Sequence, residues 1–234
     1  MIPLRDSTKS KTVPVVNYII IVLCGIVFLY EVSLGDHVEA FIHRFAVIPA
    51  HVAATVFGSD TSLDSVVFRT LHSGSQVLGT LITSLFLHGG WLHLIGNMLF
   101  LYVFGDNVED RLGHVGYLFF YLLCGIGATI AEVYFHQNSL VPVIGASGAI
   151  AGVLGAYFLL YPRAKITTLI PLFIFFPIVE ISAFFFLGFW FVMQFISGSL
   201  STGADAGGVA WWAHAGGFVV GAVLMPVFLL LRKL

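Results

Sequence analysis

Ser147 and His214 are the two residues of this sequence whose types best suit a nucleophile and its general base. Each stands near the start of a long apolar segment, residues 143–161 and 209–231 respectively. A serine hydroxyl becomes a nucleophile when a neighbouring base takes its proton, and histidine is a common base. If both segments are membrane helices running in the same direction, a rise of about 1.5 Å per residue puts both side chains roughly 7 Å below the same surface. The pattern is compatible with a Ser–His pair inside a membrane.

Glycines at four-residue spacing accompany both side chains. Gly148 and Gly152 form one small-residue stripe, and Gly217 and Gly221 form the other. Such stripes let helix backbones approach closely in lipid, and a Ser–His hydrogen bond across two helices requires close approach. The stripes also occur in helices that carry no chemistry. Taken alone, they leave open that Ser147 is an ordinary small residue of a packing interface.

His93 and Asn97 form a second polar pair. They are four residues apart and therefore share one face of a helix. Two N–H donors aimed at one point can stabilise an oxyanion, although a structural pair that ties helices together fits the spacing equally well. His88 lies on a different face from His93, and the sequence contains no HExxH or CxxC pattern. We expect no metal site and no cofactor, and interpret His88 as a hydrogen-bonded structural residue.

The composition indicates that lipid surrounds most of the chain. Hydrophobic residues make up 59% of the 234 residues and charged residues 9%, whereas a soluble domain carries about 25% charged residues. There is no basic patch that would suggest nucleic acid. A membrane span needs roughly 20 mainly apolar residues. Six segments are predicted to be spans: 15–34, 81–105, 116–135, 143–161, 179–197 and 209–231.

The fifth of these segments is the least regular. The sequence stays apolar over 166–196 but includes two prolines and Glu180, which argue against one continuous central helix. We therefore predict the helix at 179–197 and a connector at the membrane interface over 165–178. This places Glu180 at the membrane edge, with a buried, functional Glu180 as the alternative. We also expect this helix to be the looser wall of the site, with Phe191 and Phe195 packing towards the second span.

The basic residues predict the orientation. With six spans both ends face the same side, and all Lys and Arg except Arg44 and Arg69 fall on that side. Cytoplasmic loops are enriched in Lys and Arg, so both termini are predicted to be cytoplasmic. The domain organisation is then a cytoplasmic N-terminal segment over 1–14 and a six-helix membrane domain over 15–234. A long external loop covers about 35–80.

Three motifs, taken in this order along the chain, resemble the signature of the rhomboid intramembrane serine proteases. His93 to Asn97 matches the HxxxN of the family's second helix, GASG at 145–148 resembles its GxSG motif, and AHAGG at 213–217 resembles its AHxGG segment. Residues 105–109 and Gly113 resemble the turn after the second helix. The resemblance extends over about 69–221. It departs from the family at Phe68-Arg69, where Trp-Arg is frequent.

The resemblance implies an all-α, six-helix rhomboid-like bundle that acts as a serine endopeptidase. Its substrates would be other membrane proteins, cut in or near their transmembrane segments, and we expect a multi-pass protein of a prokaryotic inner membrane. Ser147 would be the nucleophile and His214 the base, with His93, Asn97 and the Ser147 backbone N–H as the oxyanion hole. No Asp or Glu adjoins His214 in the sequence, so a two-residue dyad is expected.

Two alternatives belong to other functional classes. A non-catalytic rhomboid-like protein would bind membrane clients, but such a relative is expected to lack the serine or the histidine. A transporter would usually place carboxylates near the middle of the membrane. Here the carboxylates fall at predicted span ends and in loops, with Glu180 as the one candidate exception.

Overall fold

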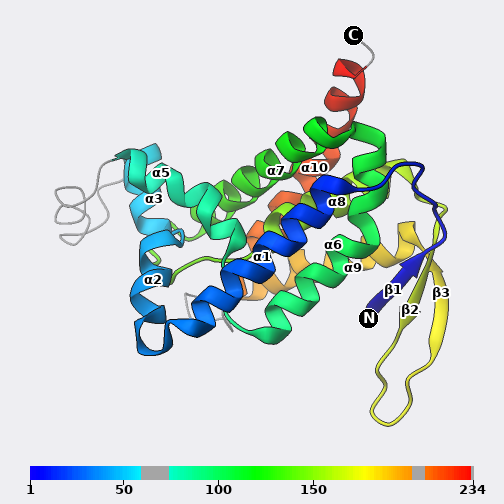
Figure 1. Ribbon diagram of the computed structural model, residues 1–234, viewed down its shortest axis with the longest axis horizontal. Helices are drawn as coiled ribbons and strands as arrows, with labels where there is room; N and C mark the ends of the chain where they lie inside the picture. The colour runs from blue at the N-terminus through cyan, green and yellow to red at the C-terminus, as the bar shows by residue number, and fades with distance from the viewer. Residues whose placement is uncertain (59–73, 202–208, 233–234) are drawn as a thin grey trace.

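The computed structural model describes residues 1–58, 74–201 and 209–232, and within these ranges the chain is mainly helical with three short strands (Figure 1). The elements follow in this order: β1 (Ile2–Asp6), α1 (Val15–Ser33), η1 (Gly35–His37), α2 (Val38–Phe45), α3 (Pro49–Val56), α5 (Gly74–Thr83), η2 (Ser84–Phe86), α6 (Trp91–Leu112), α7 (His114–Phe135), α8 (Ser147–Leu160), β2 (Lys165–Leu169), β3 (Ile178–Ser182), α9 (Ala183–Leu200) and α10 (Trp211–Leu231).

Four of the described helices, α1, α7, α9 and α10, are long and apolar enough to cross a membrane. A fifth span results if α5 with η2 and α6 count as one, although the chain bends by 81° between them. Helix α8 is apolar but has only 14 residues. The chain is an integral multi-pass membrane protein with four to five candidate spans in its described part, and a count of six stays a prediction.

Helix α6 lies further along the chain than the predicted second span. The expected turn over 105–109 is wrong, because these residues are helical and the helix ends at Leu112, before Gly113, whose φ is 73°. Gly105 is required for contact, since a Cβ there would overlap the side chain of Asn17 on α1. Glu109 is buried and accepts the backbone N–H groups of Val16 and Asn17 at 3.0 and 2.7 Å. These polar residues therefore join α1 to α6.

Helix α8 is the centre of the bundle. Every residue from Gly148 to Tyr157 is buried, which explains why this helix is apolar on all its faces. It begins at Ser147, four residues later than the predicted fourth span. The preceding chain is non-helical at Val143, which forms a backbone bridge with Val47. Ser147 is thus the first residue of the helix, and is not one turn inside it.

A three-stranded antiparallel sheet lies outside the helical bundle, and the all-α prediction misses it. Strand β2 pairs with β1 on one side and β3 on the other. Residues 179–182 therefore belong to a hairpin and α9 begins only at Ala183, so the predicted start of the fifth helix is wrong. Glu180 is exposed on β3 and pairs with Lys165 at 3.1 Å. The alternative of a buried Glu180 is excluded.

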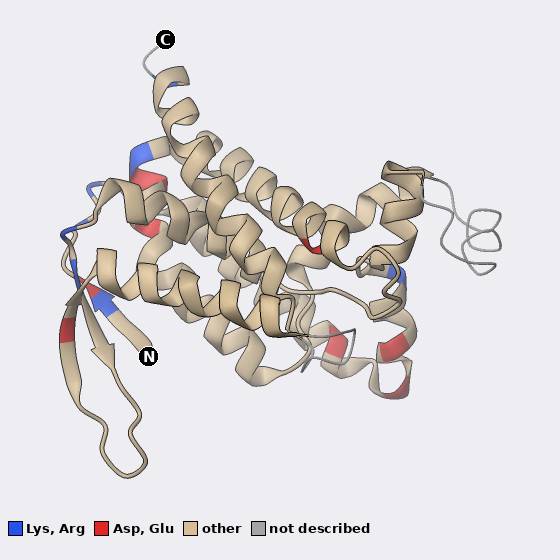
Figure 2. Cartoon of the chain, turned by 180° about the vertical axis from the view of Figure 1, so that it is seen from behind, with Lys and Arg blue, Asp and Glu red and all other residues tan. Residues whose placement is uncertain are grey.

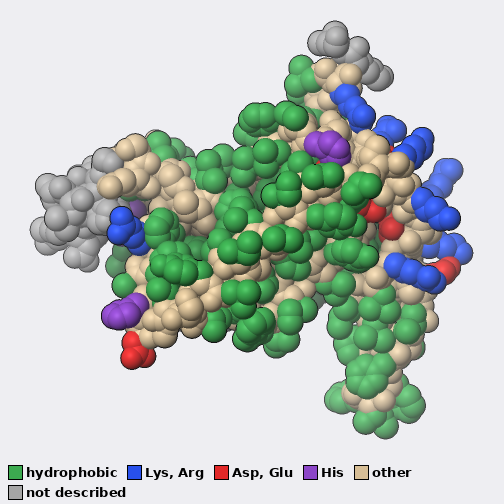
Figure 3. Space-filling view, viewed as in Figure 1, with side chains coloured by type: hydrophobic (Ala, Val, Ile, Leu, Met, Phe, Trp, Pro, Cys, Tyr) green, Lys and Arg blue, Asp and Glu red, His purple; other side chains and the backbone are tan. Residues whose placement is uncertain are grey.

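Basic side chains gather at the end of the bundle that carries the sheet, whereas α2, which carries Arg44, lies at the opposite end (Figures 1, 2 and 3). Hydrogen bonds link several elements at this basic end. Arg232, after α10, donates to the backbone carbonyls of Asp110 and Arg111, and Thr12, before α1, donates to the Asp110 carboxylate. The described Lys and Arg residues other than Arg44 are Arg5, Lys9, Lys11, Arg111, Arg163, Lys165 and Arg232.

Candidate active site

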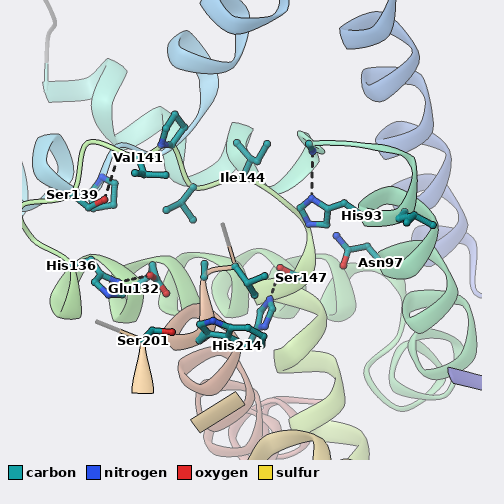
Figure 4. A pocket seen from close by; sticks show the side chains of 18 residues that line it. His93, Asn97, Glu132, His136, Ser139, Val141, Ile144, Ser147, Ser201 and His214 are labelled. Atoms are coloured by element: carbon teal, nitrogen blue, oxygen red, sulfur yellow. Dashed lines mark hydrogen bonds and ion pairs between the residues drawn. The ribbon is translucent and has the colours of Figure 1, made fainter. Parts of the chain in front are cut away.

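Ser147 and His214 are in direct contact. The Oγ of Ser147 at the start of α8 lies 2.8 Å from Nε2 of His214 in the first turn of α10 (Figure 4). The glycine stripes bring the two helices together. A Cβ on Gly217 would overlap the backbone carbonyl of Gly148, and one on Gly221 would overlap the backbone of Gly152. The predicted close approach of these stripes is confirmed.

Gln194 of α9 contacts the other ring nitrogen of His214, with its Oε1 2.8 Å from Nδ1. The side chain is buried. The sequence reasoning looked for a carboxylate near His214 along the chain and therefore missed this amide. Gln194 is a single polar residue within an otherwise apolar stretch of α9. Polar residues inside membrane helices are costly and mark candidate sites, so the signal was available in the sequence.

His93 and Asn97 of α6 line the same cavity as Ser147, and both side chains lie near Gly145. The Nδ2 of Asn97 is buried and has no hydrogen-bond partner among the described residues. The backbone N–H of Gly89 donates to Nδ1 of His93 at 3.4 Å. Gly145, two residues before Ser147, has a φ of 121°, and a Cβ there would lie 2.7 Å from Nε2 of His93. The GASG segment thus runs directly past the imidazole and requires glycine at this position.

A cavity of about 630 Å³ joins these groups. In Figure 4, Ser147 and His214 lie between the His93–Asn97 pair and a second polar pair formed by Glu132 and His136. Further polar side chains of the cavity wall are Ser139 and Ser201. The cavity combines the reactive pair with polar groups that can hold water, the second reactant of a hydrolysis.

Glu132 of α7 fixes the start of α10. Its Oε2 accepts the backbone N–H of Ala213 at 2.9 Å, and its Oε1 lies 2.6 Å from Nδ1 of His136. Glu132 is buried, whereas Glu180 is exposed. The expectation that Glu180 was the candidate exception among the carboxylates is therefore wrong, because Glu132 is the carboxylate at the site. Its position four residues before His136 was the available sequence signal.

His88 has the structural surroundings that were expected. Its backbone N–H donates to Glu31 at 3.2 Å, its Nδ1 lies 3.2 Å from the carbonyl of Phe86, and its side chain is buried. The rings of His88 and His93 pack edge to face with centroids 5.1 Å apart. Within residues 1–58, 74–201 and 209–232, no group of three His, Cys, Asp or Glu side chains is placed to hold a metal ion.

Helix α9 packs differently from the prediction. Phe191 and Phe195 face α10, with ring centroids 4.8 Å from Phe218 and 5.5 Å from Trp212 respectively, and the expected packing on the second span is wrong. The contact between α9 and α6 is made instead by Phe186, whose ring centroid lies 6.1 Å from that of Phe104. Since a helix presents several faces, spacing alone does not say which neighbour an aromatic residue meets.

Comparison with known proteins places this geometry in a family. The Rhomboid domain model matches residues 75–231. RHOMBOID-like protein 6, mitochondrial, of Arabidopsis thaliana is 31% identical over 52% of this chain and 40% of its own length. Rhomboid-like protein 11, chloroplastic, of the same plant is 40% identical over 31% of the chain and 25% of its own length.

A bacterial relative, the putative rhomboid protease YdcA of Bacillus subtilis, is 33% identical over 51% of this chain and 56% of its own length. The chain thus spans about half or less of the length of these curated relatives. The family model, in contrast, covers the bundle from α5 to the end of α10, including every residue of the cavity around Ser147 that lies on α6, α8 and α10. The chain belongs to the rhomboid family.

Proposed function

We propose that the protein is an intramembrane serine endopeptidase, with Ser147 as the nucleophile and His214 as the general base. The observation that carries this proposal is the 2.8 Å contact between Ser147 Oγ and His214 Nε2. Family membership supports an intramembrane protease type of function. The proposed substrates are other membrane proteins, cut in or near their transmembrane segments, and no metal or cofactor takes part.

The reaction follows from the contacts around Ser147. Its Oγ attacks the scissile carbonyl while His214 Nε2 takes the hydroxyl proton. The same imidazolium then gives this proton to the leaving amine, which departs and leaves an acyl-enzyme. Water from the cavity, deprotonated by His214, attacks the ester and regenerates the serine. Both halves of the reaction use one base. Nε2 takes a proton first from Ser147 and later from water, and it gives the first to the leaving amine and the second to Ser147 Oγ as the ester breaks.

The oxyanion of the tetrahedral intermediates would face three N–H donors. Asn97 contributes Nδ2, which is buried and has no partner among the described residues. His93 accepts the Gly89 N–H at Nδ1, so a neutral ring carries its proton on Nε2, beside Gly145. The third donor is the backbone N–H of Ser147, which as a first helical residue has no partner within α8. Donors preorganised in this way favour charge that develops in the transition state.

We further propose the predicted six-span topology, with residues 15–234 as the membrane domain, the segment 1–14 cytoplasmic and both termini on that side. The segregation of Lys and Arg to one end of the bundle supports this orientation (Figure 3). Helix α8, although short, is surrounded by other helices and can complete the count. A prokaryotic inner membrane is the proposed location.

The test is proteolysis by the purified protein in liposomes that contain a panel of tagged single-span membrane proteins. We expect cleavage by the parent, labelling of Ser147 by a serine-directed fluorophosphonate, and loss of both in Ser147→Ala. A matched control is Ser139→Ala, because Ser139 lines the same cavity but its hydroxyl accepts the backbone N–H of Val141. Undiminished cleavage by Ser147→Ala would refute the proposal. Binding of membrane proteins without cleavage or labelling would instead identify a non-catalytic client-binding protein.

A further inference from the structure

The contact between Gln194 and His214 has the geometry of a third member of the catalytic group. Gln194 lies on α9, whereas Ser147 and His214 lie on α8 and α10. Its Oε1 is 2.8 Å from Nδ1 of His214, and Ser147 Oγ is 2.8 Å from Nε2 on the other side of the ring. The Gln194 side chain is only 8% exposed. Water therefore does not compete strongly for this hydrogen bond.

Only one placement of protons fits the hydrogen bonds from Gln194 through His214 to Ser147. An amide oxygen has lone pairs and no hydrogen, so Gln194 Oε1 can only accept. His214 must then donate from Nδ1, and a neutral imidazole with its proton on Nδ1 has a bare Nε2. The hydroxyl of Ser147 donates to that bare nitrogen. This is the single neutral tautomer in which His214 can take the serine proton.

The orientation of the Gln194 amide is itself fixed. Its Nε2 donates to the backbone carbonyl of Trp190, one turn earlier on α9, at 3.3 Å. If the amide were turned over, Oε1 would face the carbonyl of Trp190, two acceptors would meet, and the Nε2–H would point at the ring of His214. The indole of Trp190 also packs near the imidazole, with ring centroids 5.9 Å apart. One turn of α9 thus sets both the tautomer and the tilt of the base.

We propose that Gln194 is a positioning residue, which holds the imidazole of His214 in the tautomer that can deprotonate Ser147. This inference rests on the proposed function and deepens it. A neutral amide does this without adding a charge to a buried site, where an unpaired carboxylate would be costly. Because Gln194 belongs to α9, the reactivity of Ser147 depends on the position of α9 relative to α10. A displacement of α9 from α10 leaves Nδ1 without its acceptor.

The experiment compares two replacements of similar length. Gln194→Met removes the acceptor, and Gln194→Glu keeps it while adding a negative charge; Met193→Leu, on the neighbouring exposed position, is the control. The readouts are the rate of Ser147 labelling by a fluorophosphonate as a function of pH, together with kcat and KM for a membrane substrate. We expect Gln194→Met to lower the labelling rate and kcat about tenfold or more, with little change in KM.

Gln194→Glu should keep activity and move the acid limb of the pH profile to higher pH, because a carboxylate beside Nδ1–H stabilises the imidazolium. A residue at position 194 that packed elsewhere and made no contact with Nδ1 would not move this profile. An unchanged labelling rate in Gln194→Met, or an unmoved acid limb in Gln194→Glu, would overturn the inference. Failure of the parent itself to label would contradict the proposed function, so the two failures are distinguishable.

An independent observation concerns the tip of the β2–β3 hairpin. The sequence from Ile170 to Val179 contains no polar side chain. The tip is formed by exposed large side chains, of which Phe173 is fully exposed. Figure 3 shows this apolar projection reaching out from the basic end of the molecule. The exposed tip residues are Leu172, Phe173, Ile174, Phe175 and Phe176.

The surroundings of the hairpin indicate what covers it. Helix α9 follows β3 directly and exposes further aromatic residues in its first turns, among them Phe184, Phe185 and Phe189. Only β3 separates the tip from the exposed aromatic residues of a candidate membrane span. The base of the sheet carries Arg5, which donates to Thr167, and Lys165. Apolar side chains beside cationic ones match acyl chains beside phosphates, and burial of the apolar surface in the acyl chains favours insertion.

We infer that residues 172–176 insert into the acyl-chain region of the leaflet at the basic end of the bundle. To test this, Phe173→Cys is labelled with a nitroxide and reconstituted in phosphatidylglycerol–phosphatidylcholine vesicles. The two native cysteines, Cys24 and Cys124, are buried, and the parent measures any labelling of them. Lys9→Cys, at an exposed position of the same basic end of the bundle, is the control for an aqueous position.

We expect the label at position 173 to collide more with oxygen, which concentrates in acyl chains, than with a water-soluble nickel chelate. The label at position 9 should show the reverse. The inference would be overturned if the label at position 173 collided with the nickel chelate as often as the label at position 9 does. Spin–spin broadening at position 173 that disappears on dilution with unlabelled protein would also overturn it, because the tip would then contact a second copy of the chain.

Discussion

The carboxylate of Glu132 on α7 accepts the backbone N–H of Ala213 on α10 at 2.9 Å, one residue before His214. The first N–H groups of a helix have no partner within the helix. A negative charge at a helix N-terminus is also favoured by the helix dipole. Glu132 therefore holds the turn of α10 that carries the base, although it does not touch the base.

We predict that Glu132→Ala lowers both stability and proteolysis. The change leaves the buried N–H of Ala213 unpaired, which costs about 1–3 kcal/mol. Glu132→Gln keeps an acceptor and should be milder on both measures. Thermal unfolding in detergent and fluorophosphonate labelling measure the two effects. Glu180→Gln is the control, because the exposed Glu180–Lys165 pair contributes little. Equal unfolding temperatures for Glu132→Ala and the parent would contradict the prediction.

The contact between α8 and α10 gives a second prediction. A Cβ on Gly221 would overlap the backbone of Gly152, so Gly221→Ala must push the two helices apart. Overpacking of this kind costs about 1–3 kcal/mol, and it should also reduce labelling of Ser147 by separating it from His214. Gly25→Ala on α1, where a Cβ meets no atom within 4 Å, should be neutral or stabilising. Equal behaviour of the two variants would show that the contact is looser than described.

The sequence predicts helix positions best where a helix must be long and apolar enough to cross the lipid bilayer. Apolar runs located α1, α7 and α10 to within a few residues, because a span must be long and apolar whatever it packs against. The polar stretch after Gly105 is predicted to be a turn, but it is helical. In this fold Glu109 is buried and binds the start of α1, a tertiary contact that no local pattern encodes. The sequence predicts a connector before α9 in place of the β2–β3 hairpin, because the apolar tip of the hairpin hides the alternation of its strands.

The residues of the site also differ in how well the sequence predicts them. Ser147, His214, His93 and Asn97 are predicted as site residues because each lies in a short motif, and Ser147 and His214 also because spans of equal direction place them at similar depth. Gln194 and Glu132 stand alone on α9 and α7, far from His214 in the sequence. Their roles depend on which helix face meets α10. Which face of α7 or α9 meets α10 is decided by how the helices pack against one another, and hydrophobic periodicity does not specify it.

The topology gives a third prediction. Reporter fusions at Arg5, Arg163 and Leu234 should read cytoplasmic, because the basic residues gather at that end of the bundle. Fusions at Asp60 and Thr202 should read external. Leu234, Asp60 and Thr202 lie outside the described residues, so these fusions test the prediction from sequence. An external reading at Leu234 would imply an odd number of spans and would separate the depths of Ser147 and His214.

The pH dependence gives a fourth prediction. His214 accepts the Ser147 proton only when its Nε2 is unprotonated, so proteolysis should fall as the pH drops and the imidazole takes up a proton. The rate of fluorophosphonate labelling should fall over the same pH range, since it depends on the same deprotonation. Chelators should leave both rates unchanged. A labelling rate that stays constant from about pH 8 to about pH 5 would show that another group activates the serine.

Asn97 allows the oxyanion role to be separated from a structural one. Its Nδ2 is buried and has no partner among the described residues, so Asn97→Ala removes an unsatisfied donor and should leave stability unchanged or raised. Its loss from the transition state should nevertheless cost about 2.7–4 kcal/mol, a fall of 10²–10³ in kcat. Ser147→Ala should be more damaging.

Asn17 is the matched control for this test. It is also a buried asparagine, but its Nδ2 donates to the carbonyl of Leu101 at 3.0 Å and its Oδ1 accepts the hydroxyl of Tyr117 at 2.8 Å. Asn17→Ala should therefore lower the unfolding temperature, because it leaves both partners unpaired. The two asparagines are distinguished by measuring kcat and thermal unfolding for both variants. If Asn97→Ala instead destabilised the protein as Asn17→Ala does while kcat stayed near that of the parent, Asn97 would be a structural tie, and the oxyanion would rely on His93 and the Ser147 N–H alone.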